Sequence, residues 1–341
     1  MRLAIITNGN FSIGFGHISR TLVLASQFLE AEIVFFISKE TTFTDRIKEK
    51  GYKTVILESF LEKDCKPILD YKPNAILIDS IEEDYDSLNW LSKFKHLFLI
   101  VTITLFFFDK WKRFEHLSFF PSMEESDRLK FESKFGPIEI YTGSKFFTFR
   151  DEFNLVSKKS EEDNNIVTIT MGGGDPYGLT YLVVDAILDI STQILIILSE
   201  ISPCYSKVKS MIEGKSNFKL ITKTDNIALL FSESDMVILN GGLTRYEVCA
   251  TRTPFIAISI HDKQYYITEQ LTRLGVGVNV GVYNKINKIQ IKEAVEELLE
   301  NVEARKDMAN KMKSLFDTFG AKRIKDLIND RLNSKTYEKA Y

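Results

Sequence analysis

Residues 3–26 read LAIITNGNFSIGFGHISRTLVLAS and combine a strand pattern, a glycine turn and a helix pattern. The run LAIIT at 3–7 is apolar without a break, which is typical of a buried strand. From about residue 16 to residue 30, apolar side chains recur at the spacing of an amphipathic helix. The predicted apolar face comprises Ile18, Leu22, Ala25 and Leu29. A strand that leads through a turn into a helix is the first half of a βαβ unit.

Short apolar runs and amphipathic stretches alternate along the rest of the chain. In the first half, strands are predicted at 32–38, 53–57, 75–80 and 97–104. In the second half, strands are predicted at 166–171, 193–199, 218–222, 236–240, 255–260 and 276–280, and helix follows residue 288. Continuous apolar runs indicate parallel strands that are covered on both faces. The pattern therefore predicts an α/β protein with doubly wound sheets.

A polar segment interrupts this alternation and predicts two domains. The stretch SKKSEEDNN at 157–165 has the composition of an interdomain linker. We expect a first Rossmann-like domain at 1–156, a second at 166–331 and a polar tail at 332–341. Two such domains would face each other across a cleft lined by the carboxyl ends of their strands, where ligands of such sheets bind.

Composition excludes several classes of protein. The 341 residues are 44% hydrophobic and 27% charged, which excludes a disordered chain. A net charge of −3 gives no indication of nucleic-acid binding. The three cysteines form no C-x-x-C pair, which argues against structural zinc and favours reduced thiols in a cytoplasmic protein. The most apolar run, 96–108, is shorter than the ~20 residues that span a bilayer.

The first glycine turn carries the candidate catalytic residue. Gly14 and Gly16 precede the helix, and His17 and Arg20 fall within its first turns. A helix start offers unpaired N–H groups and favours a neutral imidazole, so His17 can act as a base. Arg20 is expected beside His17 or paired with an acid of the sheet. The simpler interpretation is a histidine that only caps the turn.

Two further glycine turns follow strands in the second half. The segment MGGGDP places Gly172, Gly173 and Gly174 directly after the strand at 166–171. Glycines allow a close approach between backbone and ligand, although a tight turn without a ligand would also use them. The segment NGGLTRYE at 240–247 begins at the last residue of the strand predicted at 236–240 and opens a helix.

The segment at 240–247 is the candidate nucleotide site. Residues expected to hold a diphosphate and its ribose are Gly241, Gly242, Leu243, Thr244 and Glu247. An acid near a nucleotide turn usually accepts from ribose hydroxyls, but Glu247 could also be a plain surface residue. Gln264 follows the strand at 255–260 and is a candidate contact to the sugar or the diphosphate.

Common nucleotide and hydrolase motifs are absent from the sequence. There is no G-x-x-x-x-G-K-[ST], no G-x-G-x-x-G and no G-x-S-x-G. A histidine at a helix start in one domain and a diphosphate turn with an acid in the other fit nucleotide-sugar chemistry. We expect no metal and no cofactor, because amide groups and helix ends can balance a diphosphate.

Several segments resemble one family. The segment IGFGHISRTLVLA at 13–25 resembles the G-x-G-H-x-x-R signature of the PseG/SpsG family, and segments at 143–153, 171–176 and 240–264 resemble its later blocks. The family comprises UDP-diacetamido-trideoxy-altrose hydrolases of pseudaminic acid biosynthesis and spore coat polysaccharide proteins. The resemblance implies a GT-B-like fold related to MurG-like glycosyltransferases. It also implies that His17 is catalytic and that Gly16 and Arg20 complete its turn. By the same resemblance, the UDP moiety is bound by Gly173, Gly242, Thr244 and Glu247, and Gln264 contacts the sugar or the diphosphate.

The acceptor side departs from the family pattern. The hydrolases have a catalytic tyrosine after the fourth strand, for which Tyr85 is a late substitute here. They also have an acidic pair after the fifth strand, where this chain has Phe106, Phe107 and Phe108. Because strand side chains alternate between faces, at least one phenylalanine should line a pocket, unless all pack under the following loop. Tyr85, Phe107 and Phe108 are the candidate acceptor-side residues.

The leading hypothesis is an enzyme that hydrolyses a UDP-sugar and releases UDP and a free amino sugar, in nonulosonic acid or surface polysaccharide biosynthesis. The alternative is a GT-B glycosyltransferase that moves the sugar to an acceptor. A sugar epimerase or a non-catalytic nucleotide-sugar-binding protein is less favoured.

Overall fold

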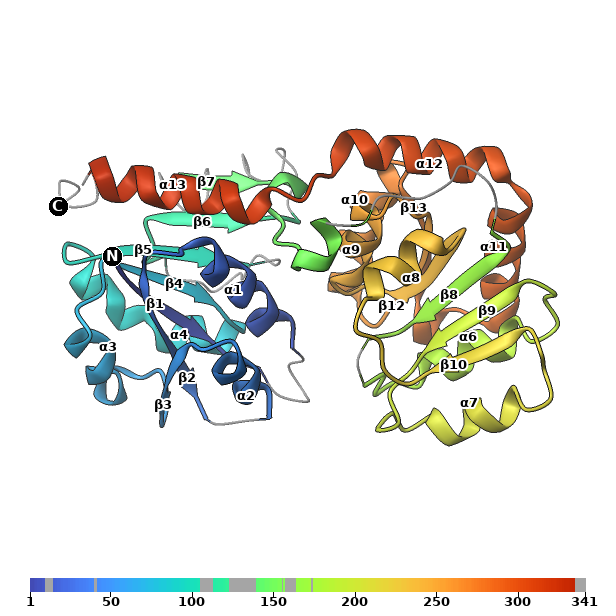
Figure 1. Cartoon of the computed structure of the whole chain (residues 1–341), viewed down its shortest axis with the longest axis horizontal. Coiled ribbons are helices and arrows are strands. Elements are labelled where there is room, and N and C mark those ends of the chain that lie inside the picture. The colour runs from blue at the N-terminus through green and yellow to red at the C-terminus, as the bar shows by residue number, and fades with distance from the viewer. Residues whose placement is uncertain are drawn as a thin grey trace. The chain divides into compact units, whose positions relative to one another are not determined.

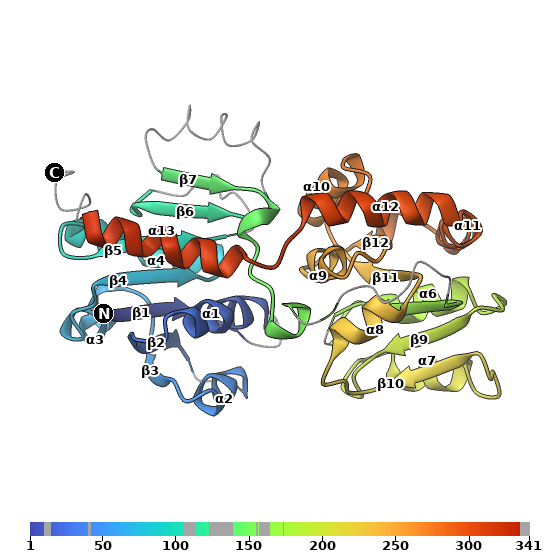
Figure 2. The same ribbon diagram turned by 45° about the horizontal axis from the view of Figure 1, so that its top comes forward.

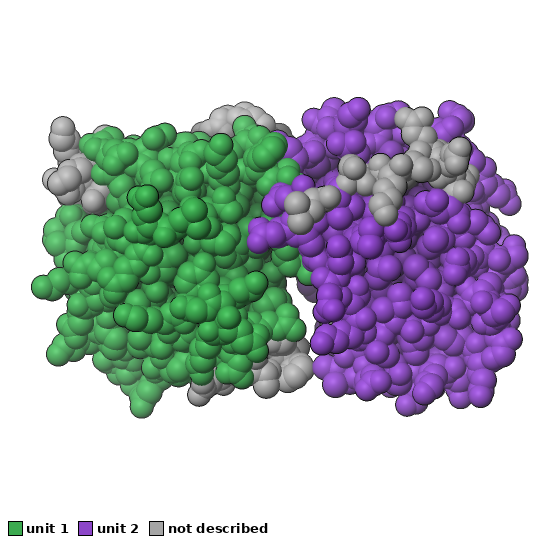
Figure 3. All heavy atoms as spheres, viewed as in Figure 1, with its two compact units in different colours: residues 1–150, 318–341 green, residues 151–317 purple. Residues whose placement is uncertain are grey.

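The computed structural model describes residues 1–9, 15–39, 42–104, 113–122, 139–154, 156, 164–172 and 174–334. The chain divides into two compact units, which Figure 3 colours separately. Unit 1 comprises residues 1–150 and 318–341, and unit 2 comprises residues 151–317. Each unit contains one parallel sheet covered by helices.

The sheet of unit 1 has seven strands in the order β3-β2-β1-β4-β5-β6-β7, and all neighbouring strands are parallel (Figure 1). The strands are β1 Arg2–Thr7, β2 Glu32–Ser38, β3 Lys53–Leu57, β4 Ala75–Asp79, β5 Leu99–Ile103, β6 Leu117–Phe120 and β7 Glu139–Thr142. The strand order reverses between β1 and β4, where Thr7 pairs with Asp79. Doubly wound sheets bind ligands at such a point, beyond the carboxyl ends of the strands.

Helices cover both faces of this sheet. They are α1 Gly16–Gln27, α2 Thr42–Glu49, α3 Lys66–Asp70, α4 Glu82–Ser87 and α13 Gly320–Ser334, with 3-10 turns at η1 Glu62–Asp64, η2 Asn89–Phe94 and η3 Ser144–Phe146. One core includes residues of α1, α2 and α13, and the other includes residues of α3 and α4. Leu3 and Ile5 of β1 belong to the first core, and Ala4 and Ile6 belong to the second. Both faces of the strand are therefore apolar, which explains its continuous apolar sequence.

The last helix, α13, belongs to unit 1, whereas the sequence analysis assigned residues 166–331 to the second domain. Ala321, Ile324 and Ile328 of α13 are buried in the first core, and the helix contacts α1, β5 and η3. Figure 2 shows α13 alongside α1 within this unit. An amphipathic sequence shows which face of a helix is buried but not which sheet covers it, so the return of the chain was not predicted.

Unit 2 has a six-stranded parallel sheet in the order β10-β9-β8-β11-β12-β13. The strands are β8 Ile166–Thr170, β9 Gln193–Ile197, β10 Phe218–Ile221, β11 Met236–Asn240, β12 Phe255–Ser259 and β13 Gly277–Val282. The helices are α6 Leu179–Ala186, α7 Tyr205–Met211, α8 Ile227–Glu233, α9 Thr244–Ala250, α10 Asp262–Arg273, α11 Lys288–Glu300 and α12 Val302–Leu315, with turns at η4 Asp151–Asn154 and η5 Tyr283–Lys285. Residues of α6, α7 and α11 join the strands in one core, while α8, α9 and α10 contact the strands separately.

The fold predicted from the sequence is confirmed, because each unit is a parallel α/β sheet and every predicted strand is present. The strands β6 and β7 were not predicted. Each has four residues, LSFF and EIYT, which is short for a strand pattern to be recognised. None of the helices within the described ranges is both long and apolar enough to cross a bilayer.

Gly320 is the first residue of α13 and lies against the backbone of Phe147. Substitution of Gly320 therefore tests this contact. A Cβ atom on Gly320 would lie 2.0 Å from the carbonyl oxygen of Phe147. Gly320→Ala should therefore displace α13 and lower the free energy of unfolding by about 1–3 kcal/mol, although alanine favours helix. Urea unfolding followed by circular dichroism measures the change. Gly174→Ala is the control, because nothing lies within 4 Å of a Cβ there. Equal stability of the two variants would contradict the close contact.

Candidate functional site

The candidate catalytic histidine lies at the start of α1. Gly16 is the first residue of the helix and His17 the second. Gly14 falls outside the described residues. The side chain of His17 is 22% exposed and that of Arg20 is 4% exposed. Residues three apart share one face of a helix, so both side chains can reach the same partner.

That partner is Asp79, the last residue of β4. Oδ1 of Asp79 lies 2.6 Å from Nδ1 of His17 and accepts a 2.6 Å hydrogen bond from Nη2 of Arg20. Oδ2 accepts a 2.7 Å bond from Nε of Arg20, so the guanidinium binds the carboxylate through two nitrogens. Nη2 of Arg20 also lies 2.9 Å from Nδ1 of His17. The expectation that Arg20 lies beside His17 and pairs with an acid of the sheet is confirmed.

The charge of Asp79 determines where the proton of His17 lies. Burial by itself raises the pKa of this fully buried carboxyl group, but Arg20 and His17 outweigh burial and hold its pKa below the usual value. An ionised carboxylate only accepts hydrogen bonds, so the 2.6 Å contact places a proton on Nδ1 of His17. When the ring carries this single proton, Nε2 holds the lone pair, and Nε2 has no partner among the described residues. A carboxylate that orients an imidazole in this way is typical of a general base.

A second carboxyl group lies at the same edge of the sheet. Asn8 follows β1 and donates through Nδ2 to Oγ of Ser38 at 2.8 Å and to Oδ2 of Asp84 at 2.7 Å. Ser80 donates to the same oxygen of Asp84. Burial raises the pKa of Asp84, although the bonds from Ser80 and Asn8 and the proximity of His17 act in the opposite direction. The edge therefore holds one carboxylate that is kept ionised and one that ionises less readily.

Of the candidate acceptor-side residues, Tyr85 lies in the part of the chain that is described, and it is buried. Tyr85 is 1% exposed, and its hydroxyl group donates to the carbonyls of Ile78 at 3.2 Å and Ile103 at 3.0 Å. The hydroxyl group of Tyr85 is therefore engaged in the core, and its assignment to the acceptor side stays a prediction. Tyr85 lies on α4, whose apolar side faces the sheet, and it satisfies two strand-end carbonyls in the core. Phe107 and Phe108 lie outside the described residues.

In unit 2, the structure brings the two glycine turns together through Asn240, the last residue of β11. Nδ2 of Asn240 donates to the carbonyl of Met171 at 2.6 Å, and its Oδ1 accepts from the N–H of Gly242 at 2.9 Å. Gly172 has a φ of 89°, which favours glycine, and a Cβ there would lie 3.2 Å from Nδ2 of Asn240. Gly173 lies outside the described residues.

The third turn packs closely against β12 and α10. A Cβ on Gly241 would lie 2.8 Å from Oγ of Ser259, 3.0 Å from Oγ1 of Thr268 and 3.1 Å from Cβ of Gln264. A Cβ on Gly242 would lie 2.7 Å from Oδ1 of Asn240. A Cβ at either position would therefore require a neighbouring side chain to move, Ser259 at Gly241 and Asn240 at Gly242.

The remaining candidates surround this turn. Leu243 caps α9, Thr244 is its first residue, and both are partly buried, as is Glu247. Gln264 lies in the first turn of α10, and its Oε1 accepts a 2.9 Å hydrogen bond from the N–H of Ile260. The structure thus gathers the candidate diphosphate residues of unit 2 at the carboxyl ends of β8, β11 and β12.

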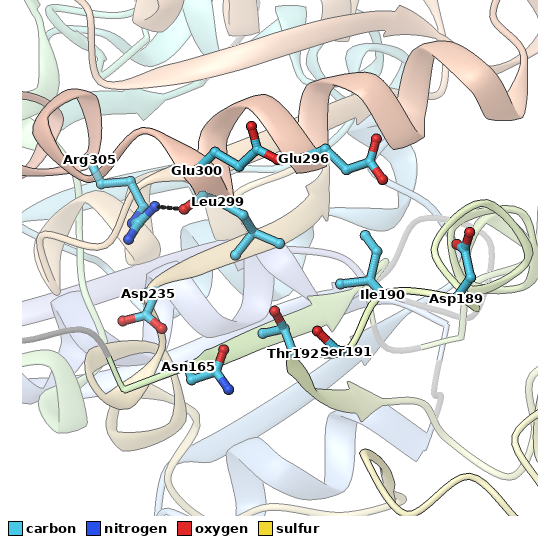
Figure 4. Close-up of a pocket in the computed structure, with 10 residues that line it drawn as sticks. All are labelled: Asn165, Asp189, Ile190, Ser191, Thr192, Asp235, Glu296, Leu299, Glu300 and Arg305. Carbon is cyan, nitrogen blue, oxygen red and sulfur yellow. Dashed lines mark hydrogen bonds between the residues drawn. The ribbon is translucent and has the colours of Figure 1, made fainter.

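A pocket of about 410 Å³ opens at the opposite edge of unit 2 (Figure 4). Its lining residues Asn165, Thr192 and Asp235 directly precede β8, β9 and β11, so the pocket lies at the amino ends of the strands. Asp235 already accepts from two backbone N–H groups, at 2.9 Å each. Because doubly wound sheets bind ligands at the carboxyl ends, this pocket is not the candidate site. Across the described ranges, no three His, Cys, Asp or Glu side chains are grouped to hold a metal ion.

Two parallel α/β units with candidate residues at the carboxyl ends of their strands have the GT-B architecture. Solved structures show the same fold. MurG of Acinetobacter baumannii aligns with a TM-score of 0.74 at 13% identity, over 96% of this chain and 99% of MurG. The spinosyn rhamnosyltransferase SpnG in complex with thymidine diphosphate aligns with a TM-score of 0.65 at 12% identity, over 96% of this chain and 100% of SpnG.

Sequence relatives confirm the resemblance found in the sequence. The UDP-2,4-diacetamido-2,4,6-trideoxy-beta-L-altropyranose hydrolase of Campylobacter jejuni is 24% identical over 82% of this chain and 98% of its own length. The spore coat polysaccharide biosynthesis protein SpsG of Bacillus subtilis is 21% identical over 57% of this chain and 59% of its own. An uncharacterised protein of Methanocaldococcus jannaschii is 29% identical over 77% of this chain and 57% of its own. The chain thus spans less than two thirds of the last two relatives. No family model matches the chain.

Sequence reasoning did not single out Asp79 or Asn240 as site residues. Both are the last residues of apolar strands, β4 and β11, beside the strand where each sheet order reverses. The carboxyl ends of parallel strands meet at the ligand edge, so a polar residue that closes an apolar strand was the available signal.

The lowered pKa of Asp79 gives a prediction for stability at acid pH. Because the pKa is lower in the folded than in the unfolded chain, the stabilisation is present above about pH 4 and is lost as pH falls through the folded value. Asp79→Asn should remove this pH dependence. It should also leave Arg20 buried without a counter-charge, which costs about 3–5 kcal/mol at neutral pH.

Urea unfolding of the wild type and of Asp79→Asn over a pH series measures both effects. Asp70→Asn, at an exposed position of α3, is the matched control. If the two variants lost the same free energy of unfolding, the cluster around Asp79 would not stabilise the fold.

Proposed function

We propose that the chain is a UDP-sugar-processing enzyme that hydrolyses its substrate to UDP and a free amino sugar, in nonulosonic acid or surface polysaccharide biosynthesis. The observation that carries this proposal is the 2.6 Å contact between Asp79 and Nδ1 of His17, which leaves Nε2 as a proton acceptor. The names of the C. jejuni and B. subtilis relatives support the substrate class. The thymidine diphosphate bound to SpnG supports a nucleoside diphosphate as the ligand of this fold.

His17 acts as the general base in this mechanism. Nε2 removes a proton from water while the water oxygen attacks the anomeric carbon of the sugar. The bond between that carbon and the UDP oxygen breaks, and its electron pair leaves with UDP. Asp79 keeps Nδ1–H oriented and stabilises the imidazolium that forms, while Arg20 keeps Asp79 ionised.

The glycine turns of unit 2 bind the leaving group. Gly242 and Asn240 hold the turn, and the N–H groups of Leu243 and Thr244 have no acceptor among the described residues. These donors bind diphosphate oxygens and stabilise the charge that develops on UDP. Glu247 accepts from the ribose hydroxyls. Gly172, Gly174 and Gln264 complete the surroundings of the diphosphate.

Glycosyl transfer is the second candidate, and the burial of Tyr85 favours it. The resemblance offered Tyr85 as the substitute for a catalytic tyrosine of the hydrolases, but this hydroxyl group is bound to two core carbonyls. In transfer, Nε2 of His17 takes its proton from an acceptor hydroxyl in place of water.

A panel of UDP-sugars, incubated with and without acceptors, separates the reactions when UDP is measured by liquid chromatography. UDP and free sugar without an acceptor support hydrolysis. UDP that forms only with an acceptor supports transfer. An epimerised sugar would instead indicate an epimerase. UDP-sugar binding without turnover would indicate a non-catalytic binding protein, and either result would contradict both hydrolysis and transfer.

Removal of the imidazole of His17 tests the proposed base. His17→Ala should lower kcat by about 10²–10⁴, the usual contribution of a general base. Its affinity for UDP should stay within about tenfold, because the nucleotide residues lie in unit 2. His96→Ala, which removes an exposed imidazole of unit 1, is the control. A His17→Ala variant with the turnover of the His96→Ala variant would remove His17 from the mechanism.

Glu247 provides an independent test of the nucleotide site. If its carboxylate accepts from both ribose hydroxyls, Glu247→Ala should weaken UDP binding by roughly 1.5–3 kcal/mol, and Glu247→Gln should lose less. Isothermal titration calorimetry with UDP measures both. Glu293→Ala, at an exposed position of α11, should leave the affinity unchanged. Unchanged affinity in both Glu247 variants would place this residue outside the nucleotide site.

A further inference from the structure

Arg245, the second residue of α9, is a buried positive charge beside the third glycine turn. Its side chain is 1% exposed, and Nη1 donates to the carbonyl oxygen of Gly241. Its guanidinium carbon lies 4.9 Å from the centre of the Tyr246 ring. A guanidinium stays protonated in proteins, so this charge needs compensation.

Two other buried arginines show how the chain compensates such a charge. Arg20 is 4% exposed and binds the carboxylate of Asp79 through two nitrogens. Arg305 is 5% exposed and donates to the carbonyls of Leu298 and Leu299 at the end of α11, where the helix dipole is negative.

Arg245 has one backbone carbonyl, that of Gly241, as its hydrogen-bond partner in the described part of the chain, and no helix end faces it as in Arg305. No carboxylate there pairs with it, and its Nε is buried without an acceptor. Oγ of Ser259 is also buried without a partner, and it would lie 2.8 Å from a Cβ on Gly241. An uncompensated buried charge is strongly unfavourable. Two unpaired polar groups next to one glycine turn therefore point to an anion that completes the arrangement.

The same arginine fixes one peptide group of the turn. The carbonyl of Gly241 is held by Arg245, and the N–H of Gly242, in the same peptide group, is held by Asn240. With both polar ends bound, this peptide group has one orientation. The following N–H groups therefore have a fixed direction before any ligand arrives, which lowers the cost of binding.

We propose that Arg245 is a positioning residue for a diphosphate anion, which supplies the counter-charge that the described residues do not provide. The inference rests on the proposed function in that the anion is the diphosphate of the UDP moiety. Arg245 acts through the turn that it orients and through its charge, and it takes no part in proton transfer. The affinity for UDP should therefore depend on Arg245 far more than the affinity for uridine does.

Calorimetry with UDP, UMP and uridine on the wild type, Arg245→Met and Arg245→Lys tests this dependence. Arg245→Met should lose about 10- to 100-fold in UDP affinity and keep its uridine affinity within about threefold. The UDP affinity of Arg245→Lys should lie between those of the wild type and Arg245→Met, since lysine keeps the charge but not the planar donor geometry. Arg305→Met, the other buried arginine of unit 2, should lower the melting temperature and leave the ratio of UDP to uridine affinity unchanged.

A folded Arg245→Met variant with the wild-type ratio of UDP to uridine affinity would overturn the proposal. If this variant does not fold, the melting temperature of the wild type provides the test. Inorganic pyrophosphate should raise this temperature as UDP does. Stabilisation by UDP but not by pyrophosphate would also overturn it. Stabilisation by pyrophosphate with no preference for UDP would instead support the anion site and contradict the proposed nucleotide function.

Discussion

Asp79 is fully buried as a charged group, and such a group is stable in a fold only when it is paired and hydrogen-bonded. Its pairing sets the geometry of the edge of unit 1. The register that places Thr7 opposite Asp79 brings the chain that leaves β1 to this carboxylate. Arg20 and His17 can both reach it because residues three apart share one face of a helix. One buried charge therefore connects the end of a strand, the first turns of a helix and an imidazole.

The two units solve different electrostatic problems at corresponding edges of their sheets. Unit 1 gathers titratable groups, with His17, Asp79 and Asp84 linked to neutral donors such as Ser80. The turn of unit 2 instead presents backbone amides and the charge of Arg245. Proton transfer requires groups that change protonation, whereas anion binding requires donors that keep their charge. This contrast supports chemistry in unit 1 and diphosphate binding in unit 2.

Local sequence pattern predicted most of this structure. Runs such as LAIIT identify strands because both faces are buried, and Gly241 and Gly242 identify a turn in which a Cβ would crowd neighbouring side chains. The pattern failed where a partner is chosen in three dimensions. A sequence marks Asp79 as the end of a strand, but only the register shows that His17 and Arg20 bind it. Likewise, α13 has an apolar face that either unit could bury, and the absence of a side chain on Gly320 allows the approach to Phe147.

At the carboxyl edge of the sheet of unit 1, one part has polar side chains and another part is filled by the buried Tyr85. This limits where the proposed acceptor can bind. Over β2, β1 and β4, Asn8 links Ser38 to Asp84 near His17. Over β4 and β5, Tyr85 fills the space and binds the carbonyls of Ile78 and Ile103. Loss of the Tyr85 hydroxyl group would remove a donor from two buried carbonyls, which is costly. Among the described residues, the groups that can meet a water molecule or an acceptor hydroxyl next to His17 are therefore those of the polar part.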